Sequence, residues 1–509
     1  MVTYSNFQHN WTKSDFVCDI PKSKDYKVYV NGEEVPVYTC RISKYPFNTW
    51  WPGHQRQIDQ TEIVSYINLV SDEEVKIEVE PLTKTAYNRI MVKPYSKGVK
   101  AEKVGGRVAF TLKKNGGYVF ELDDYHGLLY IFNNKSVSCE KSEEVTYYFG
   151  AGVHFPGKIT LKSNESVYVD KDALVYGCIF AEDAENIRIY GNGIFDDSGE
   201  ERFCEHCYEP YTNGNIKFYD CKNIKIEGVG FINSAIWCVN LFHCFDVEID
   251  GINVFGQWRY NTDGIDIVNS QRITVRNSFV HSFDDTITVK GIDRYAFESN
   301  TDMLFENCVL WCDWGMTCEI GLETMCREYC NITFRNCDIL RGGNTACDIQ
   351  NGDCAEVHHI TFENIRLELE GFYTQNIIQL SEDDKYSLHG QTEIAKIVSI
   401  QNARFREMDM YKRLMKEKAH DIGLQKGDRQ YASVHDILVK DISVYADEKV
   451  LAKKGAKCVC VYVNNIVEGS EFKNICVENV VLNGKRLQAS EMEIHTEGFE
   501  EKELIIHYL

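Results

Sequence analysis

The chain has 509 residues, of which 44% are hydrophobic, and this is enough apolar material for a large buried core. Its formal net charge is −22, which argues against nucleic acid and anionic membranes as partners, because both bind basic surfaces. No apolar run reaches the length of a transmembrane helix.

The N-terminal segment MVTYSNFQHN lacks the basic and apolar parts of a secretory leader. The 20 cysteines are scattered along the chain. Four of them fall at one place in the repeat described below: Cys221, Cys244, Cys308 and Cys337. Without a leader, reduced thiols that pack as small buried hydrophobic groups are the simpler interpretation, and we expect a cytoplasmic protein.

One CxxC motif is present, from Cys204 to Cys207, with His206 inside it. A structural zinc site needs a second ligand pair at suitable spacing, and no such pair accompanies this motif. We therefore expect a loop or core role for these residues, and neither a metal nor a cofactor.

Residues 1–147 differ from the rest of the chain. Short strand-like segments recur at 26–30, 75–79, 107–112 and 128–132, and Asn-Gly pairs follow the first and the third. Such segments with Asn-Gly turns predict antiparallel hairpins, and no long amphipathic helix pattern interrupts them. We expect an N-terminal β-sandwich domain over residues 1–147.

From about residue 148 the sequence repeats an apolar-x-apolar strand followed by Asn or Gly. The aligned apolar residues are 23 to 31 residues apart per coil. This spacing includes one extra coil near Leu304, in the longest gap. The aligned residues are Ile224, Val247, Ile273, Ile332 and Ile360. Self-similarity at this period predicts a solenoid, and the lack of a helix in each repeat favours a right-handed parallel β-helix over a leucine-rich horseshoe. We expect it to span residues 148–509, with the repeated Asn and Cys residues as interior ladders.

Residues 372–433 interrupt the repeat, which resumes at 435–444 and again at 472–480. Within the interruption, residues 403–420 have the spacing of a short amphipathic helix. Insertions in a solenoid project from one face, so we expect this one to form a wall of a binding cleft.

Three aspartates within the repeat region are spaced by about one repeat. Asp263 lies in NTDGID, and Asp284 and Asp285 lie in SFDDTI, about one repeat further on. If each repeat is one coil, these carboxylates stack on one face, where like charges repel and are costly to keep. A close group of carboxylates is also what acid/base hydrolysis of a glycosidic bond needs. For Asp266, capping of backbone N–H groups at a turn is an alternative role.

These motifs resemble those of glycoside hydrolase family 28, the polygalacturonases, and of the related family 49, the dextranases and isopullulanases. Residues 261–264 match the NTDG motif of family 28, and residues 284–285 match its paired aspartates. Residues 233–237 (NSAIW) and 191–196 (GNGIFD) resemble its NSPxW and GxGxIDG segments. The resemblance covers roughly 148–371, and a sandwich in front of the β-helix is closer to the family 49 layout.

The resemblance implies an inverting glycoside hydrolase. Asp284 would protonate the leaving oxygen, Asp263 and Asp285 would activate the water, and Asn261 would contact the substrate. An inverting pair stands roughly 6.5–9.5 Å apart to admit that water. Neighbouring carboxylates would also raise the pKa of the acid, as its role requires.

Two departures from the family 28 pattern concern the substrate. In segment 315–321, Met316 replaces the histidine of Gly-His-Gly, and further on Asp348 and Gln350 replace the Arg and Lys that bind galacturonate. A uronate would meet carboxylates here without the bidentate recognition that arginine supplies. We therefore expect a neutral oligo- or polysaccharide, such as an α-glucan or a galactan, with Asp348 and Gln350 contacting its hydroxyl groups.

Other candidate substrate-binding residues have structural alternatives. Glu319 would replace the contact of the missing histidine or coordinate a cation, unless it is only solvated. Trp258 and Trp314 would stack on sugar rings, unless they pack in the core, and His281 would bond to an aspartate, unless it is structural. Four cations remain near the motifs: Lys290, Arg259, Arg327 and Arg341.

Three alternative functions stay open. The first is a hydrolase of pectic fragments, and the second is a non-catalytic solenoid whose carboxylates only bond to sugar hydroxyl groups. The third is a β-helical lyase of anionic pectins, against which the missing cations at 348 and 350 also count. A carbohydrate is the expected partner in each case, whereas the oligomeric state and endo or exo action are not readable from the sequence.

Overall fold

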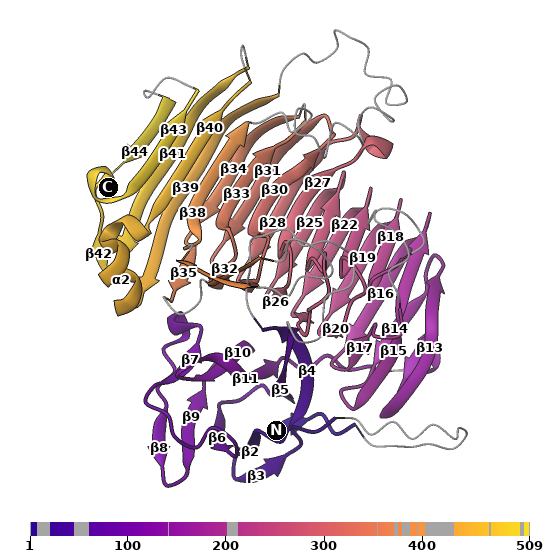
Figure 1. Ribbon diagram of the computed structural model, residues 1–509. Helices are drawn as coiled ribbons and strands as arrows, with labels where there is room; N and C mark the ends of the chain where they lie inside the picture. Colours follow the sequence, from indigo (N-terminus) through magenta and orange to yellow (C-terminus); the bar gives the residue numbers. More distant parts are fainter. Residues whose placement is uncertain are drawn as a thin grey trace.

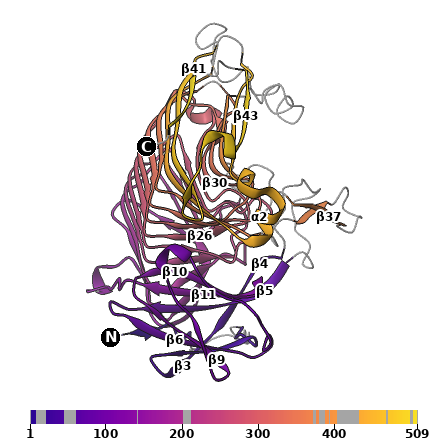
Figure 2. The ribbon, with the colours of Figure 1, turned by 90° about the vertical axis from the view of Figure 1, so that its left-hand side faces the viewer.

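The computed structural model describes residues 2–7, 21–44, 61–140, 142–200, 212–353, 355–370, 375–378, 387–392, 394–402, 432–467, 470–498 and 503–507. Strands dominate, and they form a two-sheet sandwich and one long solenoid beside it (Figures 1 and 2). Within these residues, no helix combines the length and the apolar character needed to cross a membrane.

The sandwich is built from strands β1 to β11. Its six-stranded sheet contains β1 (Thr3–Tyr4), β4 (Tyr38–Ser43), β5 (Thr61–Val70), β7 (Ile90–Lys93), β10 (Gly116–Leu122) and β11 (Asp124–Asn134). Its five-stranded sheet contains β2 (Tyr26–Val30), β3 (Glu33–Val35), β6 (Val75–Pro81), β8 (Glu102–Val104) and β9 (Arg107–Leu112).

The two Asn-Gly pairs behave differently. Asn31 and Gly32 have positive φ angles of 51° and 89° and form the expected hairpin between β2 and β3. The hairpin expected at Asn115-Gly116 is wrong, because the chain passes there from β9 in one sheet to β10 in the other.

The six-stranded sheet is buried on both faces. On one face Ile67 and Leu129 pack against the five-stranded sheet. On the other face Tyr130 and Phe132 pack against the wall of the solenoid, where Phe279 lies 5.7 Å and 5.3 Å from their ring centroids. Burial on both faces explains why residues 128–132 form an unbroken apolar run rather than an alternating one.

The solenoid is a single 31-stranded sheet in which nearly all pairings are parallel and join one coil to the next. Its strands are β12 (Tyr147–Phe149), β13 (Gly152–Leu161), β14 (Ser166–Val169), β15 (Ala173–Glu182), β16 (Glu185–Gly191), β17 (Ile194–Asp196), β18 (Ile216–Tyr219), β19 (Lys222–Glu227), β20 (Gly230–Ile232), β21 (Val239–Phe242), β22 (Phe245–Asp250), β23 (Asn253–Val254), β24 (Ile265–Val268), β25 (Gln271–Arg276), β26 (Phe279–Ser282), β27 (Ile287–Gly291), β28 (Asn300–Glu306), β29 (Val309–Cys312), β30 (Met316–Thr324), β31 (Glu328–Arg335), β32 (Asp338–Gly342), β33 (Thr345–Asn351), β34 (Glu356–Glu363), β35 (Arg366–Leu369), β38 (Lys396–Asn402), β39 (Ser433–Ala446), β40 (Cys460–Asn465), β41 (Phe472–Leu482), β42 (Lys485–Arg486), β43 (Glu493–Glu497) and β44 (Leu504–His507). Helix α2 (Glu448–Lys454) lies between β39 and β40.

The predicted parallel β-helix is confirmed, and its register follows the expected apolar residues. Ile224 pairs with Val247, which pairs with Ile273 in the next coil. The extra coil is present, but its core residue is Met303, which pairs with Ile273 and with the coil that follows. Leu304 is its neighbour in the strand and therefore faces the other side.

The interruption differs from the expected 372–433. Strand β38 (Lys396–Asn402) lies inside that range, yet it is a solenoid strand that pairs with β33 and β40. Strands β36 (Gln375–Ile378) and β37 (Ser387–Thr392) form an antiparallel pair outside the solenoid sheet. The expected helix at 403–420 lies outside the described residues.

The cysteine ladder is double. Cys221 and Cys244 precede β19 and β22, whereas Cys308 and Cys337 precede β29 and β32, so the expectation of one shared place is wrong. All four are buried, as expected, and every cysteine that the structure describes is free.

The repeated asparagines do not form the expected interior ladder. Asn277, Asn307 and Asn364 are exposed, with φ angles of 54°, 57° and 52°. Asparagine tolerates this left-handed conformation, which turns the chain between strands on the outside of the coil. The Asn364 amide donates to Asn336 Oδ1 at 2.7 Å, so the ladder lies on the exterior.

A buried ion cluster joins the sandwich to the solenoid. Lys93 Nζ lies 2.6 Å from Glu370, 3.4 Å from Glu368 and 3.5 Å from Glu121. Arg341 Nη1 lies 2.8 Å from Glu121, and its Nη2 lies 3.2 Å from Glu370. Burial raises the pKa of Glu368 to about 7, whereas Lys93 and Arg341 overcome burial and lower the pKa of Glu370 to about 2.

Replacing Arg341 by leucine leaves Glu121 and Glu370 buried without one of their partners. We expect the free energy of unfolding in urea to fall by about 3–5 kcal/mol. The control is Arg335→Leu, because Arg335 pairs with Glu306 at 2.8 Å but its side chain is 43% exposed. Its expected loss is about 0–1 kcal/mol, and equal losses in the two variants would contradict the role of the buried cluster.

Candidate active site

The three aspartates lie at the starts of neighbouring solenoid strands. Asp263 precedes β24, and Asp284 and Asp285 precede β27 in the next coil. Ile265 and Ile287, the first residues of β24 and β27, are paired. Asp263 and Asp285 each lie two residues before them, so this register sets the two aspartates level with each other. The Gly264 amide donates to the Asp285 carbonyl at 2.8 Å, which holds the two segments together. The carboxylates are therefore stacked one coil apart, as the repeat predicts.

Lys290 of β27 is the counter-ion of this cluster. Its Nζ lies 2.8 Å from Asp263, 3.1 Å from Asp266 and 3.2 Å from Asp285. It also lies 4.0 Å from the centroid of the buried Trp237 ring. Sequence reasoning treated Lys290 as a cation for the substrate and gave Asp266 a capping role. The structure instead joins both to the aspartates.

Burial and neighbouring charges shift four pKa values in the cluster, those of Asp263, Asp266, Asp284 and Lys290. Burial raises the pKa of Asp284 well above its usual value, and the charges of Asp263 and Asp285 raise it further. Burial also raises the pKa of Asp263 to about 7, against the lowering effect of Lys290. The pKa of Asp266 is raised well above its usual value by burial and then by Asp263. Burial lowers the pKa of Lys290, but the carboxylates outweigh it and raise that pKa well above its usual value.

The cluster therefore contains a charged lysine and carboxylic acids that keep their protons at neutral pH. Asp284 is a proton donor under these conditions, and Asp263 titrates close to neutrality. A proton donor beside an ionisable carboxylate is the pair that general acid/base chemistry requires.

Gly315, in the coil after the paired aspartates, makes room for them. A Cβ atom there would lie 2.3 Å from Asp285 Oδ1 and 2.5 Å from Asp284 Oδ1. The next residue, Met316, donates its backbone N–H to Asp285 Oδ1 at 2.9 Å. Asn261 donates its amide to Asp284 Oδ2 at 3.4 Å, so this predicted residue lies at the site. Met316 and Glu319 of this segment were predicted from the sequence to bear on the site, whereas Gly315 was not.

Two further acidic residues, Glu319 and Asp348, lie in the same column of side chains as Asp266, one position per coil along the solenoid. In register, the column runs through Asp266, Thr288, Glu319, Asp348 and Ser399. Burial raises the pKa of Asp348 to about 7, and it raises the pKa of Glu319 well above its usual value, with Asp285 and Asp348 adding to the effect. The raised pKa values favour the protonated forms of Glu319 and Asp348 more than in an exposed carboxyl group.

The hydrogen bonds of these two acids are incomplete. Gln350 donates to Glu319 Oε1 at 3.4 Å. Neither Glu319 Oε2 nor either carboxylate oxygen of Asp348 has a hydrogen-bond partner among the described residues. Buried polar atoms are normally bonded, so these oxygens are candidate contacts for a ligand.

The four cations named from the sequence have different surroundings. Lys290 is held by the carboxylates, and Arg341 lies in the ion cluster under the sandwich. Arg259 donates to the backbone carbonyls of residues 198 and 200, and Arg327 is exposed between β30 and β31. Lys396 of β38, which sequence reasoning missed, lowers the pKa of Asp348 by its charge.

Two half-buried tryptophans lie beside the aspartate segments. Trp314 stacks on Phe283 at 5.7 Å and lies 5.4 Å from Tyr260. Trp258 donates its indole N–H to Asn233 Oδ1 at 3.2 Å. Both rings are held in place and partly accessible, as a platform for a sugar ring would be, so this role stays a prediction.

His281 bonds to an aspartate, which was one of its two expected roles, but that aspartate is Asp313 and not one of the three stacked aspartates. Strand β26 lies against the sandwich, and its residues Phe279 and His281 face that interface, whereas Val280 faces the core of the solenoid. The ring of His281 stacks on Trp311 at 3.9 Å, and its Nε2 lies 3.0 Å from Asp313. Its Nδ1 bonds to the hydroxyl of Tyr130, which makes it a buried structural residue.

Residues 137–412 match the model of a family described as Glycosyl hydrolases family 28. A probable exopolygalacturonase B of Aspergillus fumigatus is 22% identical over 275 residues, which are 48% of this chain and 58% of that protein. An exopolygalacturonase of Zea mays is 24% identical over 240 residues, 42% of this chain and 54% of that protein. The chain thus spans little more than half the length of these relatives.

Among solved structures, Dex49A from Penicillium minioluteum has a similar fold, with a TM-score of 0.66 and 11% sequence identity. The likeness covers 99% of this chain and 98% of that one, so it includes the sandwich as well as the solenoid. At this identity it concerns the fold alone.

Replacing Lys290 by methionine removes the counter-ion of the carboxylates. We expect a loss of about 3–5 kcal/mol in the free energy of unfolding near neutral pH. Without the lysine, the pKa values of Asp263 and Asp266 rise further above the unfolded value of about 3.9. The folded state then binds more protons than the unfolded state, so stability falls as pH rises through this window.

The deficit of Lys290→Met should therefore be larger at pH 8 than at pH 5 in urea unfolding. Lys222→Met is the control, because Lys222 pairs with Glu185 at 2.8 Å but its side chain is 62% exposed. Its expected loss is no more than about 1 kcal/mol. A deficit of Lys290→Met that does not change with pH would contradict its role as the counter-ion.

Proposed function

This chain belongs to glycosyl hydrolases family 28, and we propose that it hydrolyses an O-glycosidic bond with inversion at the anomeric carbon. Asp284 is the general acid that protonates the leaving oxygen. Asp263 and Asp285 hold a water and accept its proton as its oxygen attacks the anomeric carbon. The observation that carries the proposal is the burial of Asp284, with its raised pKa, beside two aspartates that share a lysine.

The ion pairs support this division of roles. Lys290 pairs with Asp263 and Asp285, and within the described residues its ion pairs do not include Asp284. A nearby cation favours the ionised form of a carboxylate, as a base requires, and an acid without one keeps its proton. Asp263 Oδ1 has no hydrogen-bond partner among the described residues, so it is able to accept one from a water.

For the substrate we propose a neutral glycan. Where the family 28 pattern has the Arg and Lys that bind galacturonate, this chain has Asp348 and Gln350, and neither carries a positive charge. Glu319 and Asp348 are partners in adjacent coils. Their raised pKa values make them hydrogen-bond donors as well as acceptors near neutral pH, which suits sugar hydroxyl groups. An ionised uronate would in addition be repelled by any fraction of these acids that loses its proton.

A pectic substrate is the second candidate. Matching relatives from Aspergillus fumigatus and Zea mays are named as a probable exopolygalacturonase B and an exopolygalacturonase, and that is the specific observation in its favour. The charge of Lys396 near Asp348 is compatible with a uronate carboxylate at the same place.

Asp284→Asn and Asp263→Asn test the catalytic roles. We expect each to lower kcat by about 10²- to 10⁴-fold, since each removes one proton-transfer step. The pH profile of the unchanged protein should have an acidic limb near pH 7, from Asp263, and Asp263→Asn should abolish that limb. Asp246→Asn is the control, because Asp246 is 53% exposed on the outside of the solenoid.

Product analysis by NMR in the first minutes should detect the anomer opposite to that of the substrate. Full turnover in both aspartate variants would refute the assignment, and a retained anomer would refute inversion.

A substrate panel tests the charge of the substrate. We expect higher kcat/KM on α-glucans or galactans than on polygalacturonate, with the gap widening from pH 5 to pH 8. The gap should widen because Asp348 and Glu319 lose protons as pH rises, so repulsion of a uronate increases. A clear preference for polygalacturonate at both pH values would overturn the neutral substrate and leave the hydrolase itself standing.

A further inference from the structure

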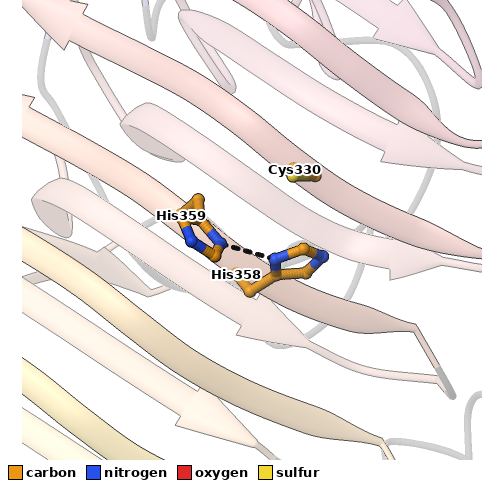
Figure 3. A group of neighbouring side chains, drawn as sticks. All are labelled: Cys330, His358 and His359. Atoms are coloured by element: carbon orange, nitrogen blue, oxygen red, sulfur yellow. Dashed lines mark hydrogen bonds between the residues drawn. The ribbon is translucent and has the colours of Figure 1, made fainter.

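Three side chains of metal-binding type gather on strands other than those that carry the aspartates. Cys330 lies in β31, and His358 and His359 lie in β34 of the next coil (Figure 3). Cys330 and His358 are partners in the parallel register. One ligand atom from each of the three lies within 4.8 Å of the others. Cys330 and His358 are half-buried, and His359 is exposed, so an ion from solvent has access to the group.

The backbone of His359 explains why two adjacent histidines face each other. Successive side chains of a strand point to opposite sides, but His359 has a φ of 53° and leaves this pattern. The same position also has positive φ in other coils, and in the two coils on either side of His359 it is occupied by Asp302, Asn331, Asp436 and Asn474.

These acidic and amide residues bond to one another along the solenoid. Asn331 donates to Asp302 Oδ1 at 2.6 Å, and Asn474 donates to Asp436. His359 breaks this ladder, since it substitutes an imidazole where the neighbouring coils have aspartate or asparagine. Its Nδ1 instead lies 2.7 Å from Nδ1 of His358.

The other nitrogen of His358 is already engaged. Nε2 lies 3.2 Å from Glu328, whose second carboxylate oxygen accepts from Ser299 at 3.1 Å. A histidine that binds a metal commonly donates its second ring N–H to a carboxylate in this way, which leaves the first nitrogen as the ligand. With Nε2 protonated, the lone pair of His358 lies on Nδ1, on the side of His359 and Cys330. Glu356 also lies close to His358 and Glu328, so the surroundings favour a cation.

We propose that Cys330 Sγ, His358 Nδ1 and His359 Nδ1 bind one divalent transition-metal ion, with zinc as the favoured metal. One thiolate and two imidazoles are a donor set that suits zinc, and a water completes four-coordination. The ion joins β31 to β34 and takes no part in the chemistry of the aspartate cluster. This proposal is independent of the proposed hydrolase activity.

Metal content and spectroscopy of the full chain test the site. The chain is stripped with a chelator and dialysed against Zn²⁺, and its bound zinc is measured by mass spectrometry. In a parallel sample Co²⁺ replaces zinc, because a thiolate bound to Co²⁺ gives a near-ultraviolet charge-transfer band. We expect the unchanged chain to bind one more equivalent of zinc than Cys330→Ser, to show the band, and to gain in Tm with Zn²⁺, because the ion binds only the folded state.

Matched variants separate the site from other thiols. Cys330→Ser should lose the charge-transfer band, and Cys476→Ser, which removes another half-buried thiol of the solenoid, should keep it. His359→Asn restores the residue type of the neighbouring coils, so it should fold normally while binding zinc at least 10-fold more weakly. Glu328→Gln keeps all three ligands and should weaken binding roughly 10- to 100-fold.

Equal zinc affinity and stoichiometry in the unchanged chain, Cys330→Ser and His359→Asn would overturn the proposal. So would a cobalt band that survives Cys330→Ser. If His359→Asn proves unstable, the comparison of Cys330→Ser with Cys476→Ser decides the question by itself.

Discussion

The ion pairs of Lys290 are the interaction on which the proposed site depends. Four carboxyl groups converge in a region almost without solvent, and one ammonium group lies against three of them. Burying a charge without a partner costs several kcal/mol, so the group persists only as a lysine with ionised partners or as neutral acids. The lysine thus decides which aspartates keep a charge and which keep a proton. Its own position is set by Trp237, whose ring lies under the ammonium.

The parallel register of the solenoid makes such a group possible. Each side-chain position is repeated one coil further on, so a short motif in each of a few coils builds a continuous column. The column through Asp266, Glu319 and Asp348 arises in this way, and so does the pairing of Cys330 with His358 on another sheet. Neighbouring coils contribute side chains that are far apart in sequence but lie within contact distance in space.

Much of the fold was predictable, because it depends on local patterns. The spacing of apolar residues from Ile224 to Ile360 determined the coils, and the adjacent aspartates with NTDG determined the location of the site. The errors concern contacts between distant segments. The contact of His281 with Tyr130 was missed because Tyr130 is 151 residues away, in the sandwich. The two cysteine ladders were merged because their separation depends on which strand of the coil follows each cysteine.

The aspartates of the candidate site were predictable from the sequence, but their ion pairs were not. Asp263, Asp284 and Asp285 were identified from sequence, and their stacking follows from the repeat. The partnership of Lys290 with Asp266 was missed, because it depends on how side chains of two adjacent strands meet in a buried space. Gly315 was missed for a related reason: a glycine has no side chain to attract notice, and its function is to leave room for two carboxylates.

The unequal lengths of the coils have a further consequence. The register from β24 to β27 pairs one residue with one residue, whereas the pairing of β27 with β30 shifts between Val289 and Gly291. Extra length is therefore accommodated by such a shift or in the connections between strands. The connection from β27 to β28 is longer than the one from β24 to β25, yet both join strands that stay aligned. These connections leave the ends of β24 and β27 that lie opposite the aspartates, so insertions and deletions in them would reshape that edge of the solenoid while the spacing of the aspartates is preserved. Such a scaffold allows selection to change one edge of the solenoid without moving the three aspartates at the other.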